Sequence, residues 1–352
     1  MGRMISALRT PLCDLLRIDV PILSVGFGVG AGPELVAAVS GAGGCGVLGG
    51  SSVPRDEMVR RIRALRALTD RPFGVNFIIA DFEADEVTDL ERAETREPID
   101  AVIAEGVPLL VLFWGPPAPF VAAAHAAGTK VFIQVGSVAE ATSAVEAGVD
   151  GVIAQGIEAG GHVRGTSSIW TLIPEVVAAI APTPVLASGG IGDGAGIARA
   201  LRLGAQGASL GTRFVASDEA FAHPAYKQRI VDSHADDTYY GELIDVGWPD
   251  APHRILRNGL FRAWDEAGRP PTGRRPGEGT MIGTNHRPWG DAAWPRYSPG
   301  MLTPWFEGDP EDAVMWGGES CEVVNDVKPA AEIVRDLARD TEFALVAEPT
   351  LT

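Results

Sequence analysis

One short segment of the chain combines a histidine with a preceding pair of glycines. Residues 155–162 read Gln-Gly-Ile-Glu-Ala-Gly-Gly-His, and they follow an apolar run at 151–154 that is typical of a buried strand. Because glycine has no Cβ, backbone at Gly160 and Gly161 can approach a flat or phosphorylated ligand closely. His162 can exchange a proton near neutral pH. The segment is therefore a candidate proton-transfer loop at a strand end.

Two further glycine-containing loops follow strand-like runs. Ser188-Gly189-Gly190 comes after residues 184–187, and Gly211-Thr212 comes at the end of the run 208–211, with Thr212 directly after it. Backbone N–H groups in such loops bind phosphate, and the hydroxyls of Ser188 and Thr212 add donors. We therefore expect a phosphate-bearing ligand at these two loops. The alternative is tight loop geometry with no ligand.

The elements that must position these residues form a repeating pattern along the first 215 residues. Short β-rich runs are predicted as strands at 20–25, 46–48, 73–79, 109–114, 130–135, 151–154, 184–187 and 208–211. Helical segments are predicted between them at 33–40, 55–68, 99–105, 119–126, 138–147, 170–180 and 195–203. No eighth helix is evident directly after Phe214. The alternation favours an α/β fold of the (β/α)₈ TIM-barrel type over an open doubly wound sheet, because no GxGxxG follows the first strand.

In such a barrel the site lies at the carboxyl ends of the strands. The remaining polar or glycine residues at predicted strand ends belong to the first, third and fifth strands. They are Gly26, Phe27, Gly28, Asn76 and Gln134. We expect them to share one site with residues 155–162, 188–190 and 211–212.

Beyond residue 217 the strand–helix repeat ends and the composition changes. Residues 218–328 are predicted as a helical and irregular extension, followed by a closing helix from 329 and a tail to 352, so that the barrel core is assigned to 1–217. Six of the eight tryptophans follow residue 247, and disordered segments are usually poor in aromatic residues. We therefore expect an ordered, Trp-rich segment that covers the barrel, with disorder as the alternative.

Composition excludes several classes of function. The net charge of −17 argues against nucleic-acid binding, which needs basic patches. Cys13, Cys45 and Cys321 are odd in number and lack CxxC spacing, so we expect neither a disulfide framework nor a metal site, and a reducing cytoplasmic location. No apolar run reaches the roughly 18 residues of a membrane span. We expect no membrane association.

These motifs together resemble the nitronate monooxygenase family, formerly called 2-nitropropane dioxygenases, over roughly residues 15–217. The resemblance rests on 155–162 with Gly165, on 187–191 with Gly194 and Gly196, and on 203–205 with 211–214. It implies an FMN-containing barrel in which His162 is the catalytic base. The phosphate is then assigned to Ser188, Gly189, Gly190, Gly211 and Thr212. The rest of the cofactor is assigned to Gly26, Phe27, Gly28, Asn76, Gln134, Gln155, Gly160 and Gly161.

The resemblance also implies the substrates, which are alkyl nitronates, nitroalkanes or propionate 3-nitronate, with O₂ as oxidant. Relatives usually carry a methionine where this chain has Phe27, so a pocket of different shape is expected. The oligomeric state is left open, with a homodimer as one option. Other functions compatible with the pattern are an FMN-dependent NAD(P)H:quinone or enoyl-thioester reductase, a redox-inert isomerase barrel, and a binding module that uses the Trp-rich segment.

Overall fold

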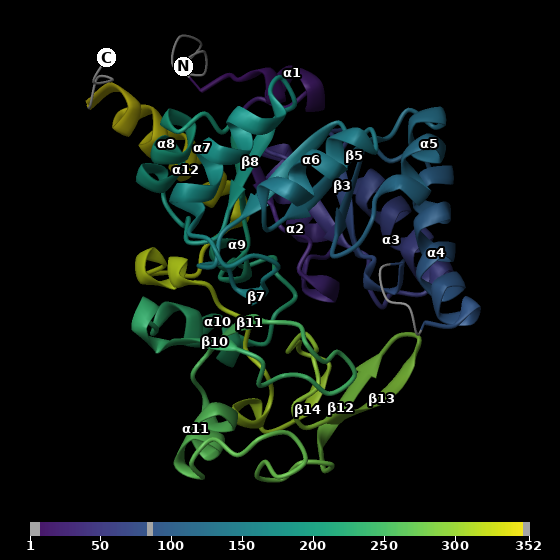
Figure 1. Cartoon of the computed structure of the whole chain (residues 1–352), viewed down its shortest axis with the longest axis vertical. Coiled ribbons are helices and arrows are strands. Elements are labelled where there is room, and N and C mark those ends of the chain that lie inside the picture. The colour runs from purple at the N-terminus through teal and green to yellow at the C-terminus, as the bar shows by residue number, and fades with distance from the viewer. Residues whose placement is uncertain (1–7, 83–86, 348–352) are drawn as a thin grey trace.

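A computed structural model describes residues 8–82 and 87–347, and its central feature is a barrel of eight parallel strands (Figure 1). The strands are β1 (Ile22–Ser24), β2 (Gly46–Gly49), β3 (Phe73–Ile78), β4 (Leu109–Phe113), β5 (Lys130–Val135), β6 (Gly151–Gln155), β8 (Val185–Ser188) and β9 (Gly207–Leu210). They are hydrogen-bonded in the order β1-β9-β8-β6-β5-β4-β3-β2. A parallel bridge between Leu23 and Cys45 joins the two ends. The predicted (β/α)₈ barrel is confirmed.

The helices that follow the strands surround this barrel. They are α2 (Pro33–Gly41), α3 (Arg55–Leu68), α4 (Asp89–Ala104), α5 (Ala118–Ala126), α6 (Val138–Glu146), α7 (Ile169–Ile180) and α8 (Gly194–Arg202). The prediction was wrong for α4, which begins ten residues before the expected position 99. The Thr88 hydroxyl and the Glu91 carboxylate form a capping box at its start, and Pro98 is accommodated within the helix.

The amino-terminal end of the barrel is closed by a short helix, α1 (Pro11–Leu16), which the sequence analysis did not predict. Leu12 and Leu16 are buried in one apolar cluster with strand residues that include Leu23, Val47 and Phe132. This end of the barrel is therefore filled by side chains, and the carboxyl ends of the strands lie at the other end.

The eighth helical position of the barrel is filled by a helix that comes more than one hundred residues after the eighth strand in the sequence. A single turn, α9 (Thr212–Val215), follows β9, and the long α12 (Ala330–Ala347) packs between α8 and α2 (Figure 1). Ile333, Val334 and Leu337 of α12 are buried in the main core. Residues 216–329 are thus inserted between the eighth strand and the helix that completes the ring.

The inserted residues form a second layer at the strand-end side of the barrel (Figure 1). Its elements are α10 (Pro224–Val231), β10 (Thr238–Gly241), β11 (His253–Leu256), α11 (Gly259–Glu266), β12 (Met281–Arg287), β13 (Gly290–Pro295) and β14 (Phe306–Gly308), with 3₁₀ turns at Ala235–Asp237, Pro310–Asp312 and Glu319–Val323. Two other 3₁₀ turns, at Gly28–Gly30 and Ala80–Phe82, belong to the barrel and not to the insertion. The insertion has its own apolar core, in which Tyr226, Phe261 and Trp294 are buried.

The insertion is joined to the barrel through a short strand, β7 (Gly161–His162). β7 pairs antiparallel with β11, so that His162 lies opposite His253. A further hydrogen bond runs from the Val163 N–H to the Pro252 carbonyl at 2.8 Å. The last two residues of the candidate proton-transfer loop, Gly161 and His162, therefore form an edge strand of the sheet β10-β11-β7. No helix within the described residues is both long and apolar enough to cross a membrane.

Candidate active site

A cavity of about 530 Å³ lies between the strand ends and the inserted layer. This volume falls within the usual range for small-molecule sites. All of the residues that the sequence analysis assigned to the site line this one cavity: Gly26, Phe27, Gly28, Asn76, Gln134, Gln155, Gly160, Gly161, His162, Ser188, Gly189, Gly190, Gly211 and Thr212. Four strand-end regions thus converge with two positions inside strands, Asn76 in β3 and Gln134 in β5, as the barrel predicts.

His162 is surrounded by aromatic rings. Its imidazole stacks on the indole of Trp248 with centroids 4.0 Å apart, and Trp316 lies at 5.2 Å and Trp114 at 6.1 Å. The Nε2 atom of His162 is buried and has no hydrogen-bond partner. Leaving a buried polar atom unpaired costs about 1–3 kcal/mol. A ligand in the cavity could satisfy this atom.

Burial of His162 lowers its pKa from 6.5 to about 3, with a smaller contribution from the nearby His253. The imidazole is therefore neutral at pH 7, in the form that accepts a proton. A negative charge placed beside the ring would raise this pKa, because it favours the imidazolium. The group is thus suited to a reaction in which an anion forms next to it.

His253 lies close to His162, with ring centres 5.7 Å apart, but the two imidazoles differ in their hydrogen bonding. Its Nδ1 lies 2.9 Å from the Ala251 carbonyl, and its Nε2 accepts a hydrogen bond from the Ile244 N–H at 3.1 Å. These partners fix the neutral tautomer with the proton on Nδ1. Burial also lowers the pKa of His253. Its bonding indicates a structural role, and it leaves His162 as the free imidazole of the cavity.

Gln155 fixes the backbone of the segment that carries His162. Its amide Nε2 donates to the His162 carbonyl at 2.9 Å, and its Oε1 accepts from the Arg164 N–H at 3.0 Å. The sequence analysis assigned Gln155 to the cofactor. In the structure its side-chain amide is engaged with β7, so its clearest role is to position His162.

The rest of the loop is held by buried charged groups. The Glu158 carboxylate accepts from the Ile169 N–H at 3.0 Å. The Arg254 guanidinium donates to the Ile157 carbonyl at 2.9 Å and pairs with Glu319, also at 2.9 Å. Because Arg254 and Glu319 belong to the insertion, the loop conformation depends on the packing of the inserted layer.

The two glycine loops form an open cradle at the ends of β8 and β9. Gly189 and Gly190 have φ angles of +100° and +67°, which favour glycine. A Cβ on Gly211 would make only an ordinary contact with Val25, at 3.8 Å, so a side chain could be added here without a clash. The Thr212 hydroxyl accepts from the Gly318 N–H at 3.0 Å and keeps its own hydrogen for a ligand. Such a cradle suits a phosphate group.

Asn76 and Gly26 meet on the opposite wall. The Asn76 amide donates to the Val111 carbonyl at 3.2 Å. A Cβ on Gly26 would lie 2.7 Å from the Asn76 Cβ, so glycine is required at this close approach. Phe27 lines the same wall next to Met301, since a Cβ built on Gly30 would meet both side chains.

The sequence analysis missed several cavity residues from the insertion. Trp248 stacks on His162, and Asn285 and Arg287 of β12 reach the cavity without having been assigned a role. The many tryptophans of this region predicted an ordered segment over the barrel, but they did not indicate which residues contact His162. Their positions depend on the pairing of β7 with β11, which has no local sequence signal.

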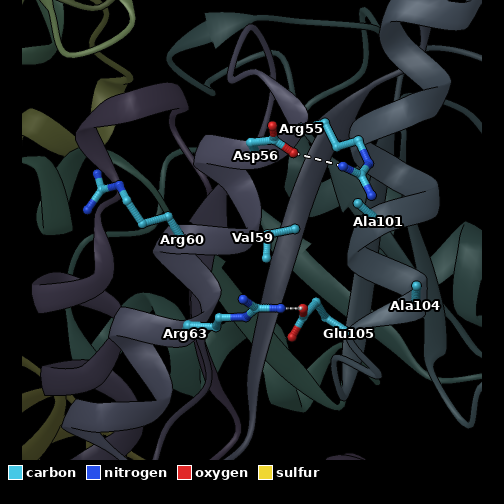
Figure 2. A pocket seen from close by; sticks show the side chains of 8 residues that line it. All are labelled: Arg55, Asp56, Val59, Arg60, Arg63, Ala101, Ala104 and Glu105. Atoms are coloured by element: carbon cyan, nitrogen blue, oxygen red, sulfur yellow. Dashed lines mark hydrogen bonds and ion pairs between the residues drawn. The ribbon is translucent and has the colours of Figure 1, made fainter.

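A second cavity, of about 500 Å³, lies on the outer helical layer between α3 and α4 (Figure 2). Its arginines are engaged in ion pairs: Arg55 with Asp56 at 2.7 Å, Arg63 with Glu105 at 2.9 Å, and Arg60 with Glu57 at 2.6 Å. None of the predicted site residues lines it. The strand-end cavity is therefore the candidate active site.

The low pKa of His162 predicts a pH-dependent stability. The unfolded histidine binds a proton near pH 6.5, whereas the folded one binds it only near pH 3. Acidification through this window therefore favours the unfolded state, by up to about 1.4 kcal/mol per pH unit. Urea unfolding of the wild type and of His162→Asn, compared between pH 7 and pH 4, should show the steeper loss in the wild type. Parallel pH profiles would contradict the burial of a neutral imidazole.

Comparisons with known proteins agree with this geometry. A family model described as nitronate monooxygenase matches residues 9–340. The chain is 35% identical over 269 residues to a nitronate monooxygenase of Paraburkholderia phytofirmans, covering 66% of this chain and 73% of the relative. It is also 35% identical over 264 residues to a (3aS,4S,5R,7aS)-5-hydroxy-7a-methyl-1-oxo-octahydro-1H-indene-4-carboxyl-CoA dehydrogenase of Mycobacterium tuberculosis, covering 74% and 70%.

Solved structures resemble the chain over almost its whole length. FabK from Thermotoga maritima aligns with a TM-score of 0.75 and 30% identity, covering 96% of this chain and 98% of that one. Nitroalkane oxidase from Streptomyces ansochromogenes aligns with a TM-score of 0.75 and 26% identity, covering 96% and 99%. The inserted layer is thus part of the shared architecture. This chain belongs to the nitronate monooxygenase family, whose members are flavin-dependent, and is an oxidoreductase acting on small molecules.

Proposed function

We propose that the protein is an FMN-dependent nitronate monooxygenase, which oxidises alkyl nitronates with O₂ to a carbonyl compound and nitrite. The observation that carries the proposal is the buried, unpartnered Nε2 of His162, which lines the same cavity as the glycine cradle. A proton acceptor in the same cavity as a loop suited to phosphate would let a flavin enzyme activate a nitroalkane.

The cradle residues fit the single terminal phosphate of FMN. Ser188, Gly189, Gly190, Gly211 and Thr212 would hold that phosphate through backbone N–H groups and two hydroxyls. We propose that Gly26, Phe27, Gly28, Asn76, Gln134, Gly160 and Gly161 contact the rest of the cofactor, and that Gln155 lines its site while positioning β7. When bound, the flavin supplies electron acceptance from the substrate and the reaction with O₂.

His162 would perform the proton transfer. The nitro group acidifies the α-hydrogen of a nitroalkane, and the neutral imidazole can remove it through Nε2. The resulting nitronate is an anion beside an imidazolium, and this ion pair is favoured in a cavity that excludes water. Trp248 and Trp316 provide the apolar walls and hold the imidazole plane. A nitronate supplied directly needs no proton removal, so it bypasses this step.

An enoyl-thioester or NAD(P)H:quinone reductase is the second candidate function. The similarity to FabK over 96% of the chain favours it. The two functions differ in the electron donor. A nitronate monooxygenase takes electrons from its substrate, whereas a reductase requires a reduced nicotinamide.

Steady-state assays on the purified holoenzyme test the proposal. We expect O₂ uptake and nitrite release with ethylnitronate, and no comparable oxidation of NADH or NADPH with a quinone or an enoyl thioester. Mass spectrometry of the released cofactor should identify FMN. Rapid NAD(P)H oxidation without nitrite formation would replace the proposal by the reductase function, and an adenine-containing flavin would overturn the phosphate assignment.

A further inference from the structure

Tryptophan side chains are concentrated on one side of the active-site cavity. The chain has eight tryptophans, and among the described residues five of them line this cavity: Trp248, Trp289, Trp294, Trp305 and Trp316. They come from the β10–β11 loop, the β12–β13 hairpin, the residue before β14 and the segment before the 3₁₀ turn at 319–323. Separate parts of the insertion thus bring the same flat, apolar side chain to one surface, the tryptophan wall.

Two indoles of the tryptophan wall are held in fixed orientations. The Nε1–H of Trp316 donates to the Gly300 carbonyl at 2.6 Å, and the Nε1–H of Trp294 donates to the Ser298 carbonyl at 3.3 Å. A Cβ on Gly300 would lie 2.5 Å from the Trp294 ring, so a larger residue would displace that indole. The segment 298–300 therefore fixes both rings, and it lines the cavity itself.

The other three indoles are only partly buried. Trp289 packs edge-on against Trp305 with ring centres 5.5 Å apart, and Trp305 lies 4.7 Å from the Phe221 ring. Trp248 stacks on the imidazole of His162. Apolar ring surface that faces a cavity favours a ligand that covers it, because covering it removes the surface from water.

The position of the tryptophan wall leaves it to the substrate. The residues that we propose for the flavin lie between positions 26 and 212, whereas the wall belongs to the insertion on the other side of the cavity. A flavin held by the barrel would leave the indoles to face the remaining space. Trp248 and Trp316 lie 4.0 and 5.2 Å from the His162 ring, so this space includes the proposed proton acceptor.

The charge of the cavity distinguishes between two kinds of ligand that indoles bind. Clusters of aromatic rings bind either flat apolar rings or quaternary ammonium cations. Among the described residues that line the cavity there is no aspartate or glutamate, and Arg287 adds a positive charge. A cation is therefore disfavoured, and an uncharged ring is the group that fits.

We propose that the tryptophan wall is a subsite for a flat apolar ring, and that the preferred substrates carry an aromatic ring a few bonds from the reacting carbon. The inference rests on the proposed function and makes it specific, because it favours ring-bearing nitronates over open-chain alkyl nitronates. A rigid ring loses less conformational freedom on stacking than a flexible chain of the same size. Trp289 and Trp305 are the specificity-determining residues, while His162 performs the proton transfer.

Kinetics of Trp305→Leu on matched nitronates test the proposal. The nitronate of 2-phenylnitroethane is compared with that of 1-nitrooctane, which has the same number of carbon atoms, and with ethylnitronate. In the wild type, kcat/KM should be about fivefold higher for the phenyl compound than for the octyl compound, as expected for one aromatic stacking contact. Leucine stays apolar but offers no flat face, so the preference should disappear, mainly through KM, with ethylnitronate unaffected. Trp305→Phe should retain part of it.

Two further variants complete the test. Trp289→Leu removes an indole between β12 and β13, at the end of the hairpin, and should lower the same preference. It carries the test if loss of the contact with Phe221 prevents Trp305→Leu from folding. Trp170→Leu is the matched control, since Trp170 lies on α7 with the Arg199 guanidinium 4.0 Å from its ring centre, outside the cavity. This variant should keep the wild-type preference.

Equilibrium binding separates this inference from the proposed function. 3-Phenylpropanoate and nonanoate imitate the two nitronates, and each is titrated into the holoenzyme by isothermal titration calorimetry, with tetramethylammonium as the cationic probe. Tighter binding of the phenyl acid that is lost in the Trp305 or Trp289 variant supports the ring subsite. If this dependence is present and no nitronate is oxidised, the nitronate function fails but the ring subsite stands. Equal binding of the two acids by the wild type, equal effects of the variants on both, or tighter binding of tetramethylammonium than of either acid would overturn the inference.

Discussion

Replacement of His162 by asparagine is expected to lower the turnover of nitroethane by about 10²–10⁴-fold, the usual contribution of a general base. Oxidation of preformed ethylnitronate should fall far less, because that substrate has already lost its proton. Asparagine retains a polar side chain of similar reach but cannot accept the proton at neutral pH. The difference between the two substrates therefore isolates proton transfer from any effect on the flavin pocket.

The controls for this variant follow from the structure. His125→Asn removes an imidazole on the outside of the barrel, where it pairs with Asp150 at 2.8 Å, and should leave both rates unchanged. Because the pKa of His162 is lowered to about 3, the wild-type rate with nitroethane should show no histidine limb near pH 6.5 and should decline only in strong acid. Equal losses on both substrates would show that His162 shapes the pocket or binds the nitro group.

Replacement of Gly211 by valine is expected to release the flavin without unfolding the barrel. Gly211 has a φ of −100°, which valine can adopt, and its Cβ would make only ordinary contacts with Val25. The valine methyl groups would instead fill the proposed phosphate space. Hydrogen bonds to charged groups contribute roughly 1.5–3 kcal/mol each, so losing two of them should weaken flavin binding by about 10²–10⁴-fold.

Gly189→Val is a less direct test of the same site. Gly189 has a φ of +100°, and its Cβ would lie 3.0 Å from the Ala159 Cβ, so the variant also strains the backbone. Gly128→Val is the matched control, since Gly128 has a φ of +78° in open space away from the cavity. Flavin content is measured by absorbance and folding by circular dichroism. Stoichiometric flavin in Gly211→Val would place the phosphate elsewhere.

The barrel could be predicted because its signals are local. Buried parallel strands are continuous apolar runs, and Gly128, Gly148 and Gly204 mark helix ends, so most boundaries lie within two residues of the predicted ones. The start of α4 was predicted ten residues too late: the capping box at Thr88 begins the helix, and Pro98 lies within it. The helix that fills the eighth position could not be connected to the barrel, since 114 residues separate α9 from α12.

The cavity residues on the barrel could likewise be predicted, because carboxyl ends of parallel strands meet at one face. The surroundings of His162 could not. Trp248 and Trp316 lie 86 and 154 residues further along the chain, and only the pairing of β7 with β11 brings them to the imidazole. The low pKa of His162 is a property of that packing, so the sequence could indicate a proton-transfer residue but not the range in which it titrates.

The central proposal is that this cavity holds a flavin which takes electrons directly from a nitronate. The most direct measurement is anaerobic titration of the purified, coloured protein, followed by its visible absorption spectrum. We expect ethylnitronate to bleach or shift the flavin bands in the absence of any nicotinamide, and NADH or NADPH to leave them unchanged on the same timescale. A spectrum that responds to NAD(P)H and not to the nitronate would contradict the account and assign the protein to the reductases.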